Sequence, residues 1–228
     1  MIDTNEFTCV IFTGLPGSGK TTCGAHLGEE LGLPFFDTDE LIESSECRTI
    51  KDIFATEGEA HFRLLEREVL RLLEHEVLKR KTASSDLPAF CDELKPVSPR
   101  LAARIAGEID GASKAKGMII AVGGGVPEPE ENREALKRLG TVVYLATEPI
   151  EIAARLTDDG LRPLLRANSP EAKGSGHARS NMVSKLKGLL DRRRQAYECA
   201  DIKIDTTGLS PHQIVNVLQE RLKTHLKI

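Results

Sequence analysis

The chain has 228 residues, a formal net charge of −4 and a sequence pI of about 5.9. This slightly acidic balance argues against a surface for nucleic acid or for an anionic membrane, and no apolar run approaches the ~20 residues that span a bilayer. The polar, acidic start M-I-D-T-N-E is unlike a signal peptide. The five cysteines are dispersed, which indicates reduced thiols. We therefore expect one cytoplasmic domain over residues 1–228.

The first predicted elements are a strand, a glycine-rich loop and a helix. The β-branched and aromatic run Phe7–Thr13 predicts the strand, and the helical pattern after the loop ends at Gly32. Between them, Gly14–Thr21 reads G-L-P-G-S-G-K-T and fills every required position of the phosphate-binding loop pattern. Backbone N–H groups of such a loop and of the helix N-terminus surround phosphate oxygens. The candidate residues for binding a nucleoside triphosphate are Gly14, Pro16, Gly17, Ser18, Gly19, Lys20, Thr21 and Thr22.

Two side chains of this loop have distinct predicted roles. Lys20 would place its ammonium on the β- and γ-phosphates, and the Thr21 hydroxyl would coordinate Mg²⁺. The alternative is a glycine-rich turn that binds nothing. Such a turn has no need for the Lys-Thr pair or for both flanking elements.

Strands and helices alternate along the rest of the chain, which favours a parallel sheet covered by helices on both faces. Further strands are predicted at Leu33–Phe36, Met118–Val122, Thr141–Leu145 and Ile202–Ile204. Helices are predicted at Glu40–Glu46, Thr49–Thr56, Glu59–Lys81, Pro149–Leu156, Val183–Ala200 and His212–Leu226. Active-site residues are then expected beyond the carboxyl ends of the strands.

Two stretches are predicted to be additions to this core. Residues 82–116 begin with an irregular, proline-containing segment and continue with a short amphipathic helix at Arg100–Ile109. Residues 159–182 include the polar, glycine-rich run Asn168–Ser180, whose composition is typical of a mobile lid. We expect the first addition to pack on the outside of the sheet, with a partner or regulatory surface as the alternative, and the second to move.

Three further groups of residues mark a second ligand. Asp37 and Asp39 follow a predicted strand, and in an extended segment one carboxylate could reach a metal ion while the other reaches a substrate hydroxyl. The alternative is that one of them only caps the next helix. Arg63 lies beside an aromatic residue at the start of a long helix, where it is either a ligand or one more surface charge. Gly123–Gly125 end a buried strand and would let a substrate approach the backbone.

In their order along the chain, these features resemble the shikimate kinase family. The matching segments are F-F-D-T-D-E-L-I-E from Phe35, F-R at Phe62–Arg63 after G-E, V-G-G-G ending at Gly125, L-R-P-L-L from Leu161, and R-x-x-x-Y from Arg193 to Tyr197. The resemblance runs from about Phe7 to about Leu226, interrupted at residues 82–116 and looser at residues 168–180. It implies an α/β, P-loop nucleoside monophosphate kinase-like three-layer fold with a five-stranded parallel sheet and a mobile lid.

The resemblance also implies an activity and its ligands. The family transfers the γ-phosphate of ATP to the 3-hydroxyl of shikimate, with Mg²⁺, on the pathway to chorismate and the aromatic amino acids. By position, Lys20, Asp39 and Arg162 form the catalytic set, with Asp39 as the candidate base and Arg162 on the lid. Thr21 and Asp37 would hold the metal ion, Asp37 through water. We expect a monomer whose partners are shikimate and ATP.

The remaining positions implied by the resemblance bind the two substrates. Arg63 and Arg193 would bind the shikimate carboxylate, and Gly123, Gly124 and Gly125 would line the same pocket together with Asp39. Arg155 and Pro211 would sandwich the adenine. Within the run Arg192–Arg194, the choice of Arg193 rests on its spacing of four residues from Tyr197, although a register error of one residue is the alternative.

Two rival interpretations stay open. A gluconate-type sugar kinase shares the fold and the phosphate loop, but it gives no reason for two convergent arginines or for the glycine triplet. A catalytically silent relative that serves as an interaction module would be expected to lack Asp39, Arg63 or Arg162, and all three are present.

Overall fold

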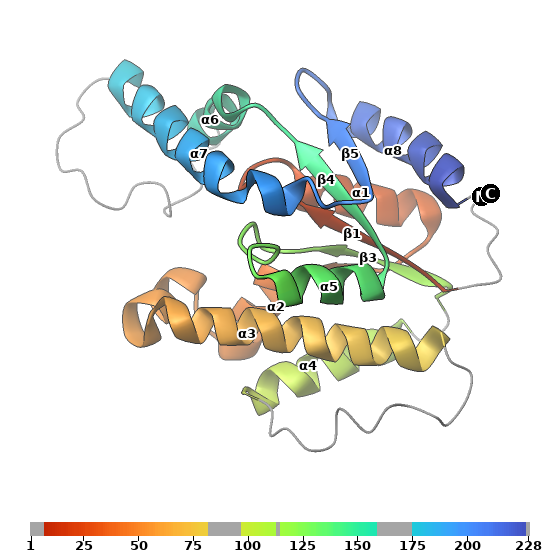
Figure 1. Cartoon of the computed structure of the whole chain (residues 1–228). Helices are drawn as coiled ribbons and strands as arrows, with labels where there is room; N and C mark the ends of the chain where they lie inside the picture. The colour runs from red at the N-terminus through yellow and green to blue at the C-terminus, as the bar shows by residue number, and fades with distance from the viewer. Residues whose placement is uncertain (1–6, 82–96, 113–114, 159–174, 227–228) are drawn as a thin grey trace.

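A parallel sheet forms the centre of the computed structural model, which describes residues 7–81, 97–112, 115–158 and 175–226 (Figure 1). Within these residues the sheet has five strands in the order β2-β3-β1-β4-β5. The strands are β1 (Thr8–Thr13), β2 (Phe35–Asp37), β3 (Gly117–Ala121), β4 (Thr141–Ala146) and β5 (Ile202–Asp205). All neighbouring strands run parallel, and Val10 of β1 lies between Ile119 and Thr141. The predicted five-stranded parallel sheet is confirmed.

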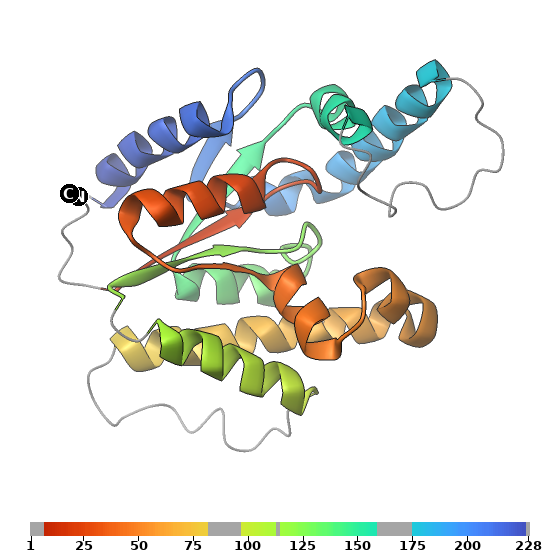
Figure 2. The ribbon, with the colours of Figure 1, turned by 180° about the vertical axis from the view of Figure 1, so that it is seen from behind.

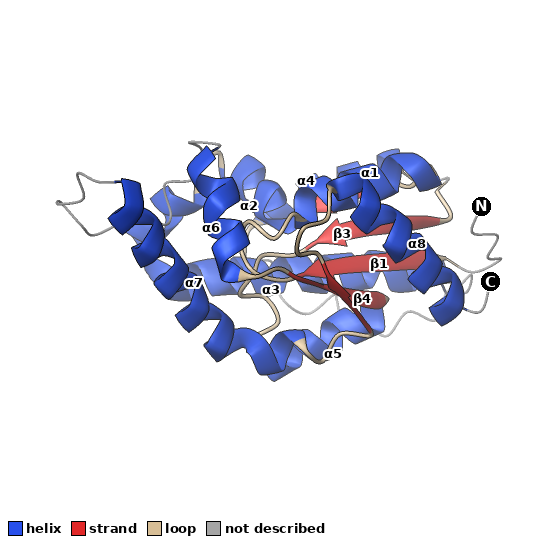
Figure 3. Ribbon diagram, turned by 90° about the horizontal axis from the view of Figure 1, so that it is seen from above, coloured by secondary structure: helices blue, strands red, loops and turns tan. Residues whose placement is uncertain are grey.

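Helices cover both faces of this sheet. They are α1 (Lys20–Leu31), α2 (Thr38–Glu46), α3 (Ile50–Lys81), α4 (Pro99–Gly111), α5 (Glu130–Leu139), α6 (Pro149–Asp158), α7 (Ser175–Tyr197) and α8 (Pro211–Leu226). Side chains alternate between faces along a strand, so Val10 and Phe12 pack with α1 and α8, whereas Cys9 and Ile11 pack with the layer that contains α3 and α5. Figure 2 shows α1 and α8 on one side of the sheet and α3 and α4 on the other. Seen from above, β1 and β3 point toward the end where α6 and α7 lie (Figure 3).

The two helices predicted at Thr49–Thr56 and Glu59–Lys81 meet at a kink inside α3. Gly58 has φ 82° and ψ 175°, a conformation that favours glycine and interrupts the helix. The predicted boundary is therefore confirmed. The second segment starts just before Arg63, which it directs toward the carboxyl end of the sheet.

Two helices differ from expectation. The helix α5 was not predicted, because its few apolar residues stand among charged ones and one of its buried positions is the polar Asn132. The helix α7 begins at Ser175 rather than Val183 and ends at Tyr197 rather than Ala200. Its first turns are made of small and polar residues without a helical apolar pattern, so the sequence did not predict them as helix. Packing of the later turns stabilises the longer helix.

The predicted addition at residues 82–116 contains the helix α4, as expected. Leu101, Ile105 and Ile109 are buried. The helix α4 packs against α2 and α3, and its buried residues share one core cluster with residues of the sheet. Ser98 caps α4 and donates a hydrogen bond to Glu46 of α2 (2.6 Å). Residues 82–96 and 113–114 lie outside the described residues, and so do residues 159–174 of the predicted lid.

No described helix combines the length and the apolar character needed to cross a membrane.

Candidate active site

The phosphate-binding loop lies between β1 and α1 and has a strained backbone that glycine relieves. Gly14, Gly17 and Gly19 have φ values of 142°, 82° and 94°. A Cβ atom at Gly14 would lie 2.7 Å from the carbonyl oxygen of Leu145, so the loop also passes too close to β4 for any side chain. Gly19 is the N-cap of α1, and the amide groups that open this helix are therefore directed at the loop's concave side.

Lys20 and Thr21 start α1 and face the loop and the neighbouring strand β2. The ammonium group of Lys20 donates to the carbonyl oxygens of Gly14 and Leu15, both at 3.1 Å. The hydroxyl of Thr21 donates to Asp37 Oδ2 at 2.7 Å. Ser18 is buried and its amide donates to Leu15 (3.1 Å), so this amide is used inside the loop.

A cavity of about 340 Å³ adjoins the loop. Its lining comes from the loop, from α1, from α6 and from the start of α8: Gly17, Gly19, Lys20, Thr21, Thr22, Cys23, Arg155, Leu156, Leu209, Pro211 and Ile214. Glu151 of α6 connects this helix to the turn before α8, because it accepts hydrogen bonds from Arg155 (2.6 Å) and from the amide of Gly208 (3.1 Å). Arg155 and Pro211, predicted around the adenine, thus both line this cavity.

The Asp37–Asp39 segment is a helix start and not an extended run. Asp37 has strand geometry and caps α2, since its Oδ1 accepts from the amide of Asp39 at 2.9 Å. Asp39 lies in the first turn of α2, which starts at Thr38 rather than at the predicted Glu40, so the condition that both carboxylates stand in one extended segment is not met. The cap interpretation holds for Asp37, whose other carboxylate oxygen remains available to Thr21.

Asp39 is held in a largely buried position beside the glycine triplet. Its Oδ1 is covered and has no hydrogen-bond partner among the described residues. A Cβ atom at Gly123 would lie 2.7 Å from this oxygen and 3.0 Å from Glu66 Oε1. Burial raises the pKa of Asp39 to about 7; Asp37 adds to the rise and Lys20 opposes it. A buried carboxylate oxygen without a donor is a natural acceptor for a substrate hydroxyl.

Arg63 lies on the other side of the triplet and is held by two carboxylates. Its Nη1 donates to Glu66 at 2.6 Å and its Nη2 to Glu59 at 2.8 Å. Only 2% of the Glu66 side chain is exposed, and burial raises its pKa although Arg63 opposes this. A Cβ atom at Gly125 would overlap the Arg63 guanidinium. Arg63 is therefore an ordered member of the pocket wall.

Arg193 reaches the triplet from α7. It is 9% exposed, whereas Arg192 and Arg194 are exposed, so burial separates the three neighbouring arginines as the spacing to Tyr197 suggested. Tyr197 donates to the carbonyl oxygen of Gly124 at 2.6 Å and stacks on Tyr144.

The phosphate loop and the triplet touch. A Cβ atom at Gly124 would lie 3.1 Å from Gly14 O and from Pro16 Cδ, and 3.4 Å from Arg193 Nη1. A phosphate held by the loop would therefore face a molecule held between Asp39, Arg63 and Arg193. Such an arrangement would place a phosphate donor beside an acceptor.

The structure brings together every predicted site residue except Arg162, which lies outside the described residues. It adds three polar residues that sequence reasoning missed. Thr38 accepts from the amide of Gly123 (3.1 Å), Glu66 holds Arg63, and Glu128 holds Arg193. Glu66 has a detectable signal, since it is a carboxylate three residues beyond Arg63 on the apolar face of a helix. Thr38 and Glu128 have none.

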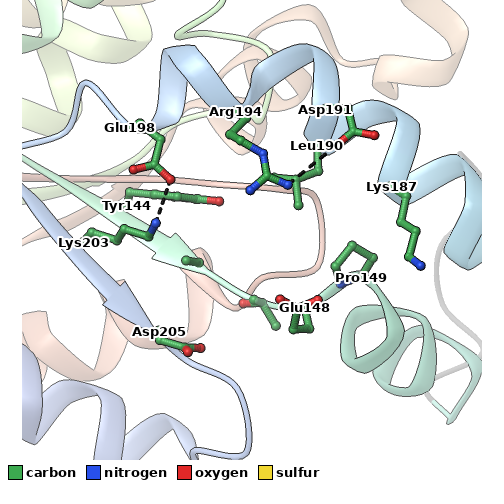
Figure 4. Close-up of a pocket in the computed structure, with 12 residues that line it drawn as sticks. Tyr144, Glu148, Pro149, Lys187, Leu190, Asp191, Arg194, Glu198, Lys203 and Asp205 are labelled. Atoms are coloured by element: carbon green, nitrogen blue, oxygen red, sulfur yellow. Dashed lines mark hydrogen bonds and ion pairs between the residues drawn. The ribbon is translucent and has the colours of Figure 1, made fainter.

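A second cavity, of about 310 Å³, lies between the ends of β4 and β5 and the helix α7 (Figure 4). It contains no predicted site residue, and its charged side chains are exposed. Two pairs partly neutralise one another, Lys203 with Glu198 (2.6 Å) and Arg194 with Asp191 (3.6 Å). The cavity beside the phosphate loop is the one whose lining combines the glycines of the loop, Lys20 and Arg155.

Comparisons with known proteins agree with this arrangement. The model of the shikimate kinase family matches residues 16–80 and 108–223, so α4 falls mostly in the gap between the two matched stretches. The chain is 35% identical over 215 residues to the shikimate kinase of Bacillus cytotoxicus, covering 94% of this chain and 98% of that protein. It is 32% identical over 214 residues to the shikimate kinase of Persephonella marina, with coverage of 94% and 98%.

Solved structures show the same likeness. The shikimate kinase of Acinetobacter baumannii in complex with shikimate superimposes with a TM-score of 0.65 at 30% identity, covering 97% of this chain and 94% of that one. The shikimate kinase of Aquifex aeolicus gives a TM-score of 0.63 at 26% identity, with coverage of 96% and 98%. By sequence and by fold, this chain belongs to the shikimate kinase family.

Proposed function

We propose that the chain transfers the γ-phosphate of ATP to the 3-hydroxyl of shikimate at the point where the phosphate loop meets the glycine triplet. The observation that carries this assignment is convergence. Two arginines surround a glycine triplet that contacts the loop, together with a carboxylate oxygen of Asp39 that has no partner in the part of the chain that the structure describes. A small acceptor that carries a carboxylate and hydroxyl groups matches this set of partners.

On the nucleotide side, the loop amides and Lys20 would bind the phosphates, and Arg155 and Pro211 would enclose the adenine. Mg²⁺ prefers oxygen ligands and keeps several waters. The oxygens of Thr21 and Asp37, 2.7 Å apart, suit this preference. A Mg²⁺ ion held by Thr21 and Asp37 would neutralise part of the phosphate charge. Thr21 and Asp37 orient one another for that purpose, since the hydroxyl donates to the carboxylate.

On the acceptor side, Arg63 and Arg193 would bind the shikimate carboxylate by charge-assisted hydrogen bonds. Asp39 would accept the hydrogen bond of the reacting hydroxyl and take its proton. Burial raises the pKa of Asp39 in the unliganded chain, which makes this carboxylate a stronger proton acceptor than an exposed one. Gly123, Gly124 and Gly125 would form the floor. A Cβ atom at Gly123 would overlap Asp39 and one at Gly125 would overlap Arg63, whereas one at Gly124 would press on the phosphate loop.

The lid arginine Arg162 completes the proposal. It would reach the transferring phosphate when residues 159–182 close over the site, and the addition at residues 82–116 would form part of the same single domain. We propose a cytoplasmic monomer without a nucleic-acid or membrane partner, because one chain supplies both ligand sites.

An ADP-release assay with alternative acceptors tests this function. The purified chain with Mg²⁺-ATP should release ADP with shikimate, and not with gluconate or nucleoside monophosphates above the background without acceptor. Comparable turnover of gluconate would favour the sugar kinase interpretation. A folded chain that binds ATP but turns over none of these acceptors would favour the silent interaction module.

A further inference from the structure

Glu128 makes the main contact with the arginine that the proposed function assigns to the substrate carboxylate. A single oxygen, Glu128 Oε1, accepts from Arg193 Nε at 2.8 Å and from Arg193 Nη2 at 2.7 Å. These two nitrogens form one edge of the planar guanidinium. The third nitrogen, Nη1, lies on the side of Gly124. Glu128 thus holds one edge of the guanidinium plane, and the third nitrogen lies toward the glycine triplet.

The loop that carries Glu128 is well fixed. The amide of Val126 donates to Gly123 (3.0 Å) and the amide of Glu128 donates to Gly125 (3.1 Å), so the triplet leads into two successive turns. Two side chains of α5 hold the outer carbonyls: Asn132 donates to Val126 (2.8 Å) and Arg133 donates to Glu128 (2.6 Å).

Prolines add to this rigidity. Glu128 stands between Pro127 and Pro129, each of which has a fixed φ angle. The loop therefore presents the carboxylate at a set position. Its partner Arg193 is on a different element, the buried face of α7. Because Glu128 already restricts the Arg193 side chain, this side chain loses little further conformational freedom when a ligand binds.

We propose that Glu128 is a positioning residue for substrate binding, which holds Arg193 in the orientation that the acceptor carboxylate requires. This inference rests on the proposed function. The alternative role for the same contact is competition, in which Glu128 occupies the place of the substrate carboxylate. The geometry favours positioning, because Glu128 approaches the Nε–Nη2 edge and leaves Nη1 on the side of the triplet.

Two substitutions separate geometry from charge. Because one oxygen accepts both hydrogen bonds, Glu128→Gln can keep both of them while it removes the negative charge. Glu128→Ala removes both. We expect Glu128→Ala to raise KM for shikimate about 5- to 10-fold, the loss of a charge-assisted pair, while kcat and KM for ATP change less than about 2-fold. Glu128→Gln should keep KM for shikimate at or below the wild-type value.

Glu131→Ala is the matched control, because Glu131 follows on α5, is 64% exposed and pairs only with the surface Arg67 in the contacts described. It should behave as wild type. An unchanged KM for shikimate in Glu128→Ala would overturn the proposal. A lowered KM would also overturn it and would indicate that Glu128 competes with the substrate carboxylate for Arg193. An equal rise of KM for shikimate in Glu128→Ala and Glu128→Gln would overturn the proposal as well. The negative charge of Glu128, and not its hydrogen bonds to Arg193, would then determine substrate binding.

An NMR measurement on Arg193 without substrate tests the positioning role separately from catalytic activity. The Nε–H group of Arg193 should give a slowly exchanging, ordered NMR signal in wild type and in Glu128→Gln, and lose that protection in Glu128→Ala. If the signal stays ordered in Glu128→Ala, positioning by Glu128 is refuted. A wild-type chain that does not phosphorylate shikimate would instead refute the proposed function and leave this NMR comparison to decide the role of Glu128.

Discussion

The phosphate loop and the acceptor pocket touch, yet they are built in different ways. The loop is one contiguous run, residues 14–21, whose shape comes from backbone angles and whose single cation is Lys20. The acceptor pocket is assembled from α2, α3, the turn after β3 and α7, and each of its arginines is held by carboxylates. The nucleotide half should therefore depend on backbone conformation and the acceptor half on ion pairs between distant elements.

The two halves also differ in their charges. The buried carboxyl groups whose pKa is raised, Asp39 and Glu66, both belong to the acceptor half. The partners of Lys20 that face the loop are backbone carbonyls. We therefore expect substitutions to divide into those that change turnover with ATP and those that change the use of shikimate. Four predictions test this division.

The largest effect is expected from Lys20→Ala. It removes a cation aimed at the transferring phosphate, and we expect kcat to fall by about 10²-fold or more with an intact fold. Arg162→Ala should have a comparable effect if the lid arginine acts on the same group. Steady-state kinetics with a thermal unfolding control measure both, and Lys51→Ala, an exposed lysine of α3, is the matched control. Near-wild-type turnover by the folded Lys20→Ala variant would refute the role of the loop.

The next effect falls on the acceptor half. Removing one partner of a desolvated charge pair costs about 2–5 kcal/mol, so Arg63→Ala or Arg193→Ala should lower kcat/KM for shikimate by roughly 30-fold or more. ATP affinity without the acceptor should change far less. Arg192→Ala, one residue away and exposed, should leave kcat/KM unchanged.

A shikimate analogue with a neutral amide in place of the carboxylate sharpens this second test. It should be a poor substrate for wild type and should be much less sensitive to the arginine substitutions, because the group they bind is gone. If wild type phosphorylates the amide as well as shikimate, the carboxylate clamp is wrong.

A smaller effect is expected from Gly125→Ala. The added methyl group would overlap the guanidinium of Arg63 and force it to move, which should raise KM for shikimate about 10-fold through misplacement of one contact. Gly188→Ala is the control, because Gly188 lies in α7 with open space around it. There the alanine should stabilise the helix by roughly 0.5–1 kcal/mol without changing KM. A normal KM in Gly125→Ala would mean that Arg63 does not need its place beside the triplet.

The smallest effect concerns stability and pH in metal-free, nucleotide-free protein. Asp39 has a pKa of about 7 in the folded chain and an ordinary value of 3.8, so the folded state holds an extra proton between these values. Wild type should then lose stability as pH rises from about 4 to 7. Asp39→Asn has no such proton. The free energy of unfolding of this variant, relative to that of wild type, should therefore rise by ~1 kcal/mol or more between pH 4 and pH 8. Denaturant unfolding at both pH values measures it. If the difference in free energy of unfolding between the variant and wild type is the same at both pH values, burial does not raise the pKa of Asp39.

The parts that could be predicted are those with local signals. The strand, loop and helix around Gly14–Thr21, the break at Gly58 and the helix within residues 82–116 each depend on a few neighbouring residues. The helix α5 escaped prediction because a buried Asn132 bonds to a loop carbonyl, which makes a polar residue acceptable in the core. The helix α2 was predicted from Glu40 and starts at Thr38, because a strand end and a helix start look alike over three residues.

By itself, the sequence determined the parallel α/β class, the phosphate loop and the identity of the residues around it, because glycine angles, apolar periodicity and a contiguous motif act within a few residues. Only the tertiary structure decided which carboxylates hold the two arginines, that Arg193 rather than its neighbours is buried, and that the triplet touches the loop. These contacts join residues far apart in the chain, such as Glu128 and Arg193. Their geometry follows from how α3, α7 and the sheet pack, and no local pattern of residues encodes it.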